Sequence, residues 1–381
     1  MKKTLCLLLT ALLAFTCVMA AGCGKKETST VIKIGATGPL TGGAALYGTA
    51  CKNAAEIAVE EINALGGLQF ELKYEDDAHD AEKAVNAYNS LKDWGMQVSL
   101  GSVTSAPAQA TSVLSYEDRI FALTPSASSY DVVDGKDNVY QMCFIDPTQG
   151  TASADYIAKK ALGTKIAVIW KNDDVYSKGI YDTFMVEAAK VGLEVVSDTT
   201  FTSDSQTDFS VQLLDAQNNG ADLVYLPMYY EAASLILIQA DNMGYKPTFF
   251  GVDGMDGILT LENFDVSLAE GVILLTPFSA DATDENTQAF VKKYEEKCGI
   301  RPNQFAADAY DCVYAIYQAC QAGGVTPDMT AEQINDIMIE QFSTMTFDGL
   351  TGAGATWNAD GTVAKPAGGM VIQNGDYVGL D

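Results

Sequence analysis

Short apolar runs alternate along the chain with longer segments in which apolar residues recur every three or four positions. The short runs are rich in β-branched and aromatic residues and predict strands at 31–34, 68–74, 98–100, 120–123, 165–170, 193–199, 223–227 and 271–275. The longer segments predict helices at 51–65, 177–191, 208–218, 231–243, 287–297, 304–322 and 330–345. This alternation is typical of an α/β fold with parallel sheets, and the number of units requires two doubly wound sheets.

No long linker divides the sequence after residue 30. Two lobes without a linker usually mean that the chain crosses between them several times. Turn-forming clusters at Asp146-Pro147, at Pro277 and at Asp348-Gly349 are the candidate crossings.

The amino terminus has the features of an export signal. Two lysines precede an apolar run that ends in small residues and then meets a cysteine. Small residues before cysteine are similar to a bacterial lipobox, although Ala20 stands where leucine is usual. This predicts a signal peptide over 1–22 and a lipid-carrying Cys23 that opens a polar tether, 23–30. An ordinary signal peptide with an incidental Cys23 is the alternative. We expect an extracytoplasmic protein, lipid-anchored to the outer face of the cell membrane.

The charge of the chain excludes several classes of partner. Of the 381 residues 23 are basic and 50 acidic, and loss of the signal peptide leaves 359 residues with a net charge of about −29. Nucleic acid and anionic membranes would repel such a chain, so neither is expected to bind it directly. Five cysteines follow Cys23 without a CxxC pair or a nearby histidine, which predicts neither a zinc site nor a disulfide scaffold.

Two hydroxyl-rich segments each follow a predicted strand. Ser102–Pro107 precedes a helical stretch that reaches Tyr116, and Ser105 suits the N-cap of that helix, with Pro107 in its first turn. Free backbone N–H groups and hydroxyls at a helix start form a neutral site for a carboxylate, although a plain capped helix is an equal alternative for this segment alone. Thr124–Ser129 follows the next strand, and ligands of open α/β sheets collect at such carboxyl ends.

The remaining motifs do not indicate an enzyme. Gly35–Gly43 matches neither nucleotide-binding pattern, so its glycines are expected to allow a sharp turn or close approach to a ligand. Glu75–Asp77 and Asp281–Glu285 lack calcium-loop spacing and are expected to be solvated turns. His79, the only histidine, is expected at the surface, and GxSxG and HExxH are absent. The spacing of residues does not exclude a catalytic Ser/Lys or carboxylate pair, although no such pair stands out. We expect no enzyme, no cofactor and no metal.

The order of these motifs resembles the leucine/isoleucine/valine-binding protein family, which has the type I periplasmic binding fold. The resemblance covers essentially the whole mature chain. It is carried by Ile34–Gly43 with Tyr47-Gly48, 55–67 (AEIAVEEINALGG), Tyr74–Asp77, Thr124-Pro125, Asp146–Gly150 and Phe347–Gly349 with Thr351-Gly352. Each run is modest alone. In this order and spacing they are specific to the family, although not to a ligand.

The resemblance implies a site for a zwitterion. Family members hold the ligand carboxylate with a hydroxyl that matches Ser105 and with the hydroxyl and N–H that match Ser128. The ligand ammonium meets the carbonyl that matches Ser126 and an acidic residue that matches Asp253. Neutral donors facing a carboxylate, and one carboxylate facing an ammonium, suit a free amino acid. The remaining implied ligand-binding residues are Tyr47, Ala127, Tyr176, Tyr229 and Phe305.

Plain structural alternatives stand beside these assignments. Asp253 precedes a glycine and could be a turn residue, and Phe305 opens a tyrosine-rich helix, where core packing is common. Some family members have a disulfide at positions that match His79 and Thr104. Both cysteines are missing here, which leaves the loop that carries Ser105 dependent on packing and capping.

The implied mechanism is closure of two lobes about a multi-stranded hinge. One lobe would comprise 31–146 and 277–350, and the other 147–276 and 351–381. The chain would capture a branched-chain or other small amino acid and deliver it to the permease of an ABC transporter. A ligand-sensing module and a binder of amides or short peptides are alternatives on the same fold. A hydrolase is disfavoured because no nucleophile and base pair stands out. A cytoplasmic repressor is excluded because an export signal stands where DNA-binding helices should be.

Overall fold

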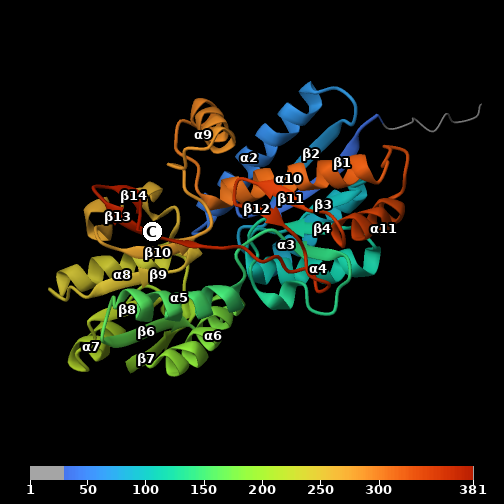
Figure 1. Ribbon diagram of the computed structural model, residues 1–381. Coiled ribbons are helices and arrows are strands. Elements are labelled where there is room, and N and C mark those ends of the chain that lie inside the picture. Colours follow the sequence, from blue (N-terminus) through green and yellow to red (C-terminus); the bar gives the residue numbers. More distant parts are fainter. Residues whose placement is uncertain (1–29, 381) are drawn as a thin grey trace, which may run out of the picture. The chain divides into compact units, whose positions relative to one another are not determined.

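The computed structural model describes residues 30–380 (Figure 1). The signal peptide and Cys23 lie outside the described residues, and so does the predicted tether apart from Thr30. Among the described residues, no helix is both long and apolar enough to cross a bilayer.

A parallel five-stranded sheet is formed by the first part of the chain, in the order β2-β1-β3-β4-β5. Its strands are β1 (Ile32–Gly38), β2 (Phe70–Asp76), β3 (Val98–Leu100), β4 (Ala122–Thr124) and β5 (Val139–Gln141). The alternate residues Ile32 and Ile34 of β1 are fully buried in one core with α2 (Ala45–Ala64) and α10 (Gln304–Ala322). Smaller apolar clusters join α3 (Ala81–Trp94) and α4 (Ser105–Asp118) to the sheet.

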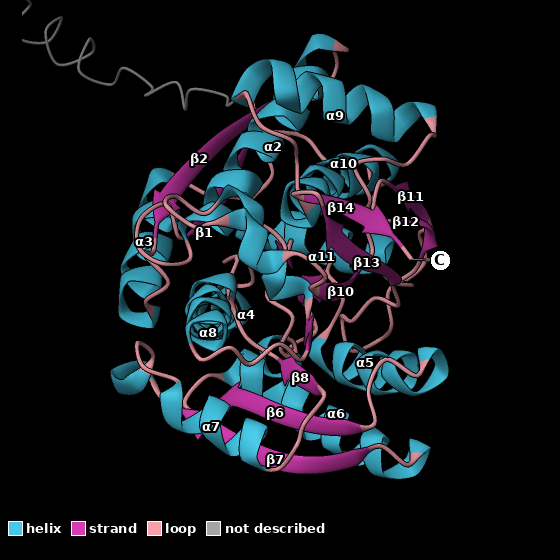
Figure 2. Ribbon diagram, turned by 90° about the vertical axis from the view of Figure 1, so that its left-hand side faces the viewer, coloured by secondary structure: helices cyan, strands magenta, loops and turns pink. Residues whose placement is uncertain are grey.

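A seven-stranded sheet, in the order β14-β13-β10-β9-β8-β6-β7, follows. Its parallel strands are β6 (Lys165–Lys171), β7 (Glu194–Phe201), β8 (Leu223–Leu226), β9 (Thr248–Gly251) and β10 (Ile273–Thr276). The hairpin of β13 (Gly368–Gln373) and β14 (Asp376–Gly379) adds to β10 in the antiparallel direction. A mostly parallel sheet must be covered on both faces, and Figure 2 shows helices on both sides of it.

Alternation along β6 explains how the helices divide between the two faces. Ile166 and Val168 pack in one core with α5 (Asp146–Lys160) and α6 (Val175–Val191). Ala167 and Ile169 pack in another core with α7 (Ser210–Asn218) and α8 (Tyr230–Asn242). Successive side chains of a strand point to opposite faces, so one strand serves both cores.

The chain returns to the five-stranded half after β10. There α9 (Glu285–Cys298) contacts α2, and α10 packs extensively along α2. α11 (Ala331–Phe342) contacts α10, and Figure 1 shows both of these later helices beside the five-stranded sheet. The short strands β11 (Phe347–Gly349) and β12 (Gly352–Ala355) form a separate pair. Among the described residues, short 3-10 helices lie at Tyr130–Val132, Ser203–Ser205, Asp253–Met255, Ile258–Thr260 and Val266–Ala269.

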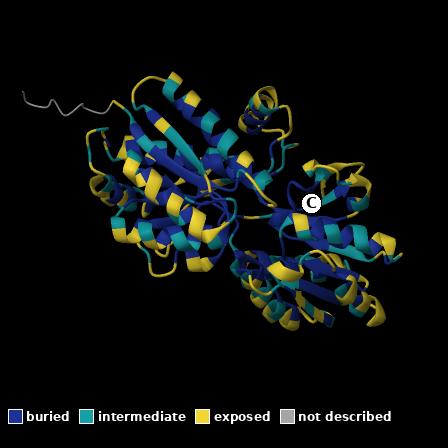
Figure 3. Ribbon diagram, turned by 180° about the vertical axis from the view of Figure 1, so that it is seen from behind, coloured by how far each residue is buried: buried dark blue, intermediate teal, exposed yellow. Residues whose placement is uncertain are grey.

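The predicted lobe boundaries stay a prediction, but the cores place the last crossing. Trp357 and Val363 are buried in the core of the five-stranded half, whereas β13 already belongs to the seven-stranded sheet. The chain therefore passes between the two cores after residue 363. Figure 3 shows buried residues lining the sheets and exposed residues on the outer sides of the helices.

The predicted α/β architecture with two mostly parallel sheets is confirmed. The expected elements omit α3, α5, β5, β9 and the carboxy-terminal strands. The sequence does contain start and stop signals for α3, because Asp80 caps the helix and Gly95 ends it in the left-handed conformation. For α5 the signal is a proline in the first turn and two lysines in the last. The missed strands are three to six residues long, too short for periodicity to identify them.

Candidate functional site

A small buried cavity lies where the carboxyl ends of strands from both sheets meet. It is lined by Tyr47, Val103, Thr104, Ser126, Tyr176, Tyr229, Asp253, Gly254 and Phe305. Thr104 and Ser126 follow β3 and β4, whereas Tyr176, Tyr229 and Asp253 follow β6, β8 and β9. Parallel strands bring the loops at their carboxyl ends together, which explains how residues far apart in sequence share one site. No lysine or arginine is among these lining residues.

Tyr47 joins the two halves across this cavity. Its hydroxyl donates to the carbonyl of Gly254 at 2.6 Å and accepts from the backbone N–H of Tyr230 at 3.1 Å. Leu46 N–H in turn donates to the Tyr230 hydroxyl at 3.3 Å. The first turn of α2 is therefore hydrogen-bonded to the loops that follow β8 and β9. The family resemblance implies a wall residue here, and the structure adds a contact that holds the cavity closed.

Asp253 is the buried acid of the cavity. It is 3% exposed, and its Oδ1 accepts from the Tyr176 hydroxyl at 2.5 Å. Its backbone N–H donates to Gln149 Oε1 at 3.2 Å. Burial raises the pKa of Asp253 to about 7, against the partial opposition of Tyr176 and Gln149. A buried carboxyl with only neutral partners is a poor stabiliser of the fold and a suitable partner for a ligand cation.

Aromatic rings form much of the cavity wall. Tyr176 and Tyr229 stack with ring centroids 4.5 Å apart, and Phe305 meets Tyr47 edge-on at 4.6 Å. Tyr47 also lies 5.6 Å from Tyr229, so rings from both halves touch. Such offset and edge-to-face pairs are the geometries that aromatic quadrupoles favour. Phe305 is buried within the core, as the structural alternative expected, and it also lines the cavity.

The hydroxyl-rich loops approach the cavity from the five-stranded half. Ser126 lines it directly. Ser105 and Ser128 are buried next to lining residues but are not among them; Ser105 Oγ accepts from Ser129 N–H at 3.2 Å. Ala127 is also outside the lining, and its carbonyl accepts from Gln141 Nε2 at 2.7 Å. Ser105 is not an N-cap as expected: Thr104 has the extended cap conformation and Ser105 begins the helix.

Two residues of the run Asp146–Gly150, which carries the family resemblance, support the site although sequence reasoning gave them no role there. Gln149 fixes the backbone of Asp253, and its own Nε2 donates to the Phe144 carbonyl at 2.8 Å. Asp146 is fully buried, and its carboxylate lacks a hydrogen bond of ordinary geometry within the described residues. Burial raises the pKa of Asp146 well above its usual value, which the nearby Ser128 hydroxyl only partly offsets.

The surface position expected for His79 is wrong. Its ring is half-buried, its Nδ1 hydrogen-bonds Thr104 Oγ1 at 2.9 Å, and it meets the Tyr229 ring edge-on at 5.3 Å. Burial, with Lys171 nearby, lowers the pKa of His79 to about 4, so the ring is neutral near pH 7. The two positions that hold a disulfide in some family members are thus linked here by a hydrogen bond. The loop that carries Ser105 has this tether in addition to packing.

Two other sequence interpretations need correction. Asp77 was expected in a solvated turn but is fully buried, and burial raises its pKa to about 7. Gly35 was expected to allow a turn or ligand approach, yet a side chain there would collide with Met96 and Leu91 under the sheet. Only Gly42 in this run has a positive φ, 81°, as a sharp turn requires. No cluster of metal-ligating side chains occurs among residues 30–380.

Comparisons with known proteins agree with this architecture. The Leu/Ile/Val-binding protein homolog 3 of Brucella melitensis is 30% identical over 305 residues, which cover 79% of this chain and 81% of that protein. A Streptococcus pneumoniae branched-chain amino acid transporter substrate-binding protein, solved with isoleucine, is 28% identical, with a TM-score of 0.82 over 91% of this chain and 97% of that one. A solute-binding protein of R. palustris, solved with benzoate, has a TM-score of 0.81 at 21% identity over 92% and 95% of the two chains, which shows a shared fold.

The model of one protein family matches nearly the whole described chain, over residues 31–376. Its coverage includes both sheets and each segment that lines the cavity. The similar proteins bind a substrate, and those of them that are at least 28% identical are a Leu/Ile/Val-binding protein homolog and a branched-chain amino acid transporter protein. The chain therefore belongs to the periplasmic binding protein family, among the Leu/Ile/Val-binding proteins of branched-chain amino acid ABC transporters.

Proposed function

We propose that this chain captures a free amino acid in the cavity around Asp253 and delivers it to the permease of an ABC transporter, without catalysing a reaction. Closure of the predicted lobes, 31–146 with 277–350 against 147–276 with 351–381, would trap the ligand. The observation that carries the proposal is the buried carboxyl of Asp253, which has no basic partner among the described residues and shares a cavity with hydroxyl groups of the opposite half.

The predicted ligand contacts follow from the charges of a zwitterion. The ammonium would bind Asp253 and the carbonyl of Ser126, and the carboxylate would bind the hydroxyls of Ser105 and Ser128. The Ser128 hydroxyl supports this, because it is buried without a hydrogen bond of ordinary geometry in the described residues. Buried polar groups are normally hydrogen-bonded, and the nearby acceptor for this hydroxyl is the Asp146 carboxyl, with which a ligand carboxylate would compete. Tyr47, Ala127, Tyr176, Tyr229 and Phe305 would enclose the rest of the ligand.

The test is a calorimetric screen of the purified full chain against the free amino acids, their amides and benzoate. We expect saturable binding of at least one aliphatic amino acid, and weaker binding of the matching amide because it lacks the carboxylate. Ser105→Ala should weaken this binding and, because it leaves the buried Ser129 N–H without its acceptor, should also lower the free energy of unfolding by about 1–3 kcal/mol. Binding of benzoate or a short peptide, with no response to any amino acid, would overturn the proposed ligand class.

We further propose that Cys23 carries the lipid that holds the protein at the outer face of the cell membrane. The motif before Cys23 supports this assignment. Mass spectrometry of protein extracted from its own membrane should show a diacylglyceryl group on that residue. Cys23→Ser should release the protein into the medium or periplasm, whereas a Cys23→Ser protein that stays membrane-bound would contradict the anchor.

A further inference from the structure

A second and larger cavity lies beside the candidate site. Its volume is about 320 Å³, within the range of roughly 300–1,000 Å³ that ligand pockets occupy. We call it the side chamber. Its apolar lining consists of Leu46, Ala50, Leu259, Leu274, Phe278, Ile300 and Met370 with the rings of Tyr294 and Tyr377. Ile300 is 47% exposed, so this apolar surface reaches solvent.

The side chamber is distinct from the cavity around Asp253. The two share no lining residue, although both are built from α2, from the loop after β9 and from the start of α10. Tyr47, which is hydrogen-bonded to Gly254, and Phe305, which packs on Tyr47, line the first cavity but not the side chamber. The side chamber also uses the β13–β14 hairpin, which contributes nothing to the first cavity.

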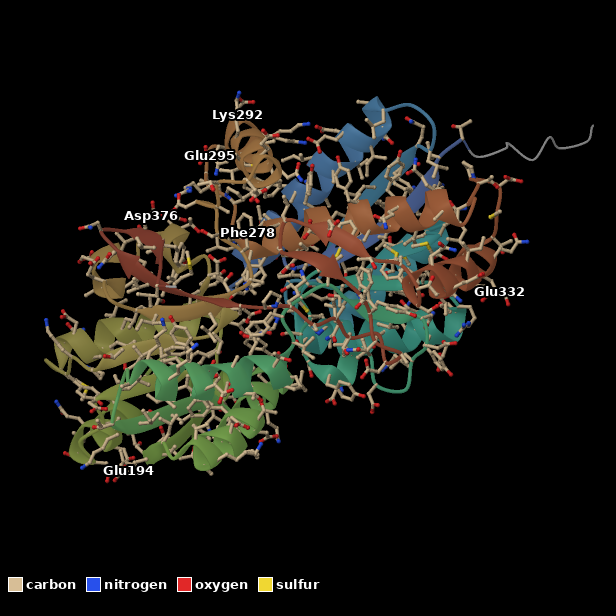
Figure 4. All side chains as sticks on the ribbon, viewed as in Figure 1. Glu194, Phe278, Lys292, Glu295, Glu332 and Asp376 are labelled. Atoms are coloured by element: carbon tan, nitrogen blue, oxygen red, sulfur yellow. The ribbon has the colours of Figure 1, made fainter. Side chains whose placement is uncertain are left out.

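The charges around the side chamber are unbalanced. Among its lining residues are three carboxylates and one guanidinium. Arg301 pairs with two of the carboxylates, Asp281 at 2.7 Å and Asp376 at 3.2 Å. Glu295 on α9 lies 3.7 Å from the same guanidinium, and Figure 4 labels Glu295 and Asp376 together with Phe278 of the lining.

The third carboxylate, Asp256, is buried and lacks a basic partner in the part of the chain that the structure describes. It is 6% exposed, and its Oδ2 accepts from the backbone N–H of Gln304 at 2.8 Å. Its other neighbours include the neutral Tyr377 hydroxyl, the Gly257 backbone N–H and the like charge of Asp308. An apolar cavity that ends at a buried acid with neutral donors complements a cation attached to an apolar body.

We propose that the side chamber is a second ligand site, which takes a small and mainly apolar molecule that carries one positive charge. The apolar walls would bury its body, and Asp256 would receive its charge. The proposal does not depend on the identity of the amino acid at the first site, because the two cavities have separate linings.

Three probes of matched shape test the charge preference: phenethylamine, phenethyl alcohol and phenylacetate. Titration calorimetry of the full chain should show saturable binding of phenethylamine, about tenfold or more tighter than that of phenylacetate, because an anion would face unpaired Asp256. Phenethyl alcohol should lie between them. Equal or tighter binding of phenylacetate, or no binding of phenethylamine, would overturn the proposal.

Variants locate the binding. Leu259→Trp should fill the side chamber and abolish phenethylamine binding, whereas the same change at Leu214, which is 49% exposed on α7, should leave it intact. Ala280→Phe should fill the chamber from another wall. It serves as the second chamber-filling variant if Leu259→Trp fails to fold. Asp256→Asn should remove the preference for the amine, and Asp253→Asn should not change it. Loss of amine binding in Asp253→Asn, or its persistence in both chamber-filling variants, would place the amine elsewhere and refute the side chamber.

Discussion

Two buried aspartates of this protein have opposite surroundings. Asp308 on α10 pairs with Lys365 at 2.5 Å, and the same ammonium contacts Thr351 Oγ1. Asp253 in the cavity has Tyr176 and Gln149 as neighbours, and no base within residues 30–380 pairs with it. Both carboxyls are almost completely buried, so both bear the cost of desolvation. Within residues 30–380 the protein supplies a cation for one acid and not for the other, which fits a structural role for Asp308 and the ligand-binding role that we propose for Asp253.

The paired acid belongs to a network that links three segments of the chain. Asp311, one turn after Asp308, accepts from the backbone N–H groups of Leu350 and Thr351 and from the Thr351 hydroxyl at 2.7–3.0 Å. Lys365 lies just before β13, where the chain passes between the two cores after residue 363. The network therefore fixes α10 to the segments through which the chain passes between the two cores.

Removal of Lys365 should have the largest effect on stability. Lys365→Met keeps the apolar stem but leaves Asp308 buried without its cation, which should cost about 3–5 kcal/mol of unfolding free energy. Urea denaturation at pH 8 measures this loss. Lys178→Met is the matched control, because the Lys178–Asp182 pair is half exposed and should contribute less than about 1 kcal/mol. Equal losses of unfolding free energy in the two variants would mean that Asp308 does not depend on Lys365, and the contrast with Asp253 would fail.

Removal of the charge of Asp253 should affect binding and spare the fold. Asp253→Asn should cost about 2–5 kcal/mol of binding free energy, or roughly thirtyfold or more in affinity, because the ligand ammonium loses its counter-charge. The same variant should melt no lower than the original protein, since it removes an unpaired buried charge. Calorimetry and thermal denaturation measure the two effects. A destabilised variant with unchanged affinity would make Asp253 a structural residue.

The hydroxyl of Tyr47 should help to hold the two halves closed around the ligand, and it should not affect which ligand charges are recognised. Tyr47→Phe leaves the Gly254 carbonyl and the Tyr230 N–H unpaired, which should weaken amino acid binding by about 1–3 kcal/mol. The preference among amino acids should not change, because the ring stays in place. Tyr88→Phe, which removes a buried tyrosine hydroxyl on α3 far from the cavity, is the control for loss of a hydroxyl. A changed preference with unchanged affinity would assign Tyr47 to ligand recognition.

Much of the fold could be predicted from the sequence, but less of the candidate site. The two-sheet architecture follows from the pattern because most strands of the two sheets contain a short apolar run and alternate with segments of helical periodicity. Asp253 and the tyrosines could be assigned only through the resemblance, since a lone acid before a glycine has no distinctive pattern. The pairing of Asp308 with Lys365 joins residues 57 positions apart, and the contact of His79 with Tyr229 crosses between the halves. No local pattern encodes such contacts. They depend on the chain geometry that brings distant loops together.

The dependence of binding on pH offers the finest test of the unpaired acid. The pKa of Asp253 is about 7 in the folded protein against an ordinary value of 3.8, so the ligand-free fold holds this proton up to about pH 7. A ligand ammonium favours the carboxylate, so binding below pH 7 must release the proton. Affinity should therefore be flat above pH 8 and roughly tenfold lower at pH 6. Calorimetry in buffers of different ionisation enthalpy measures the affinity and the released proton together. The charges of Asp146 and Asp308 also interact with Asp253, so Asp253→Asn is the necessary control. If the affinity of this variant keeps the same dependence on pH, the proton belongs to another buried acid, and the contrast between Asp253 and Asp308 fails.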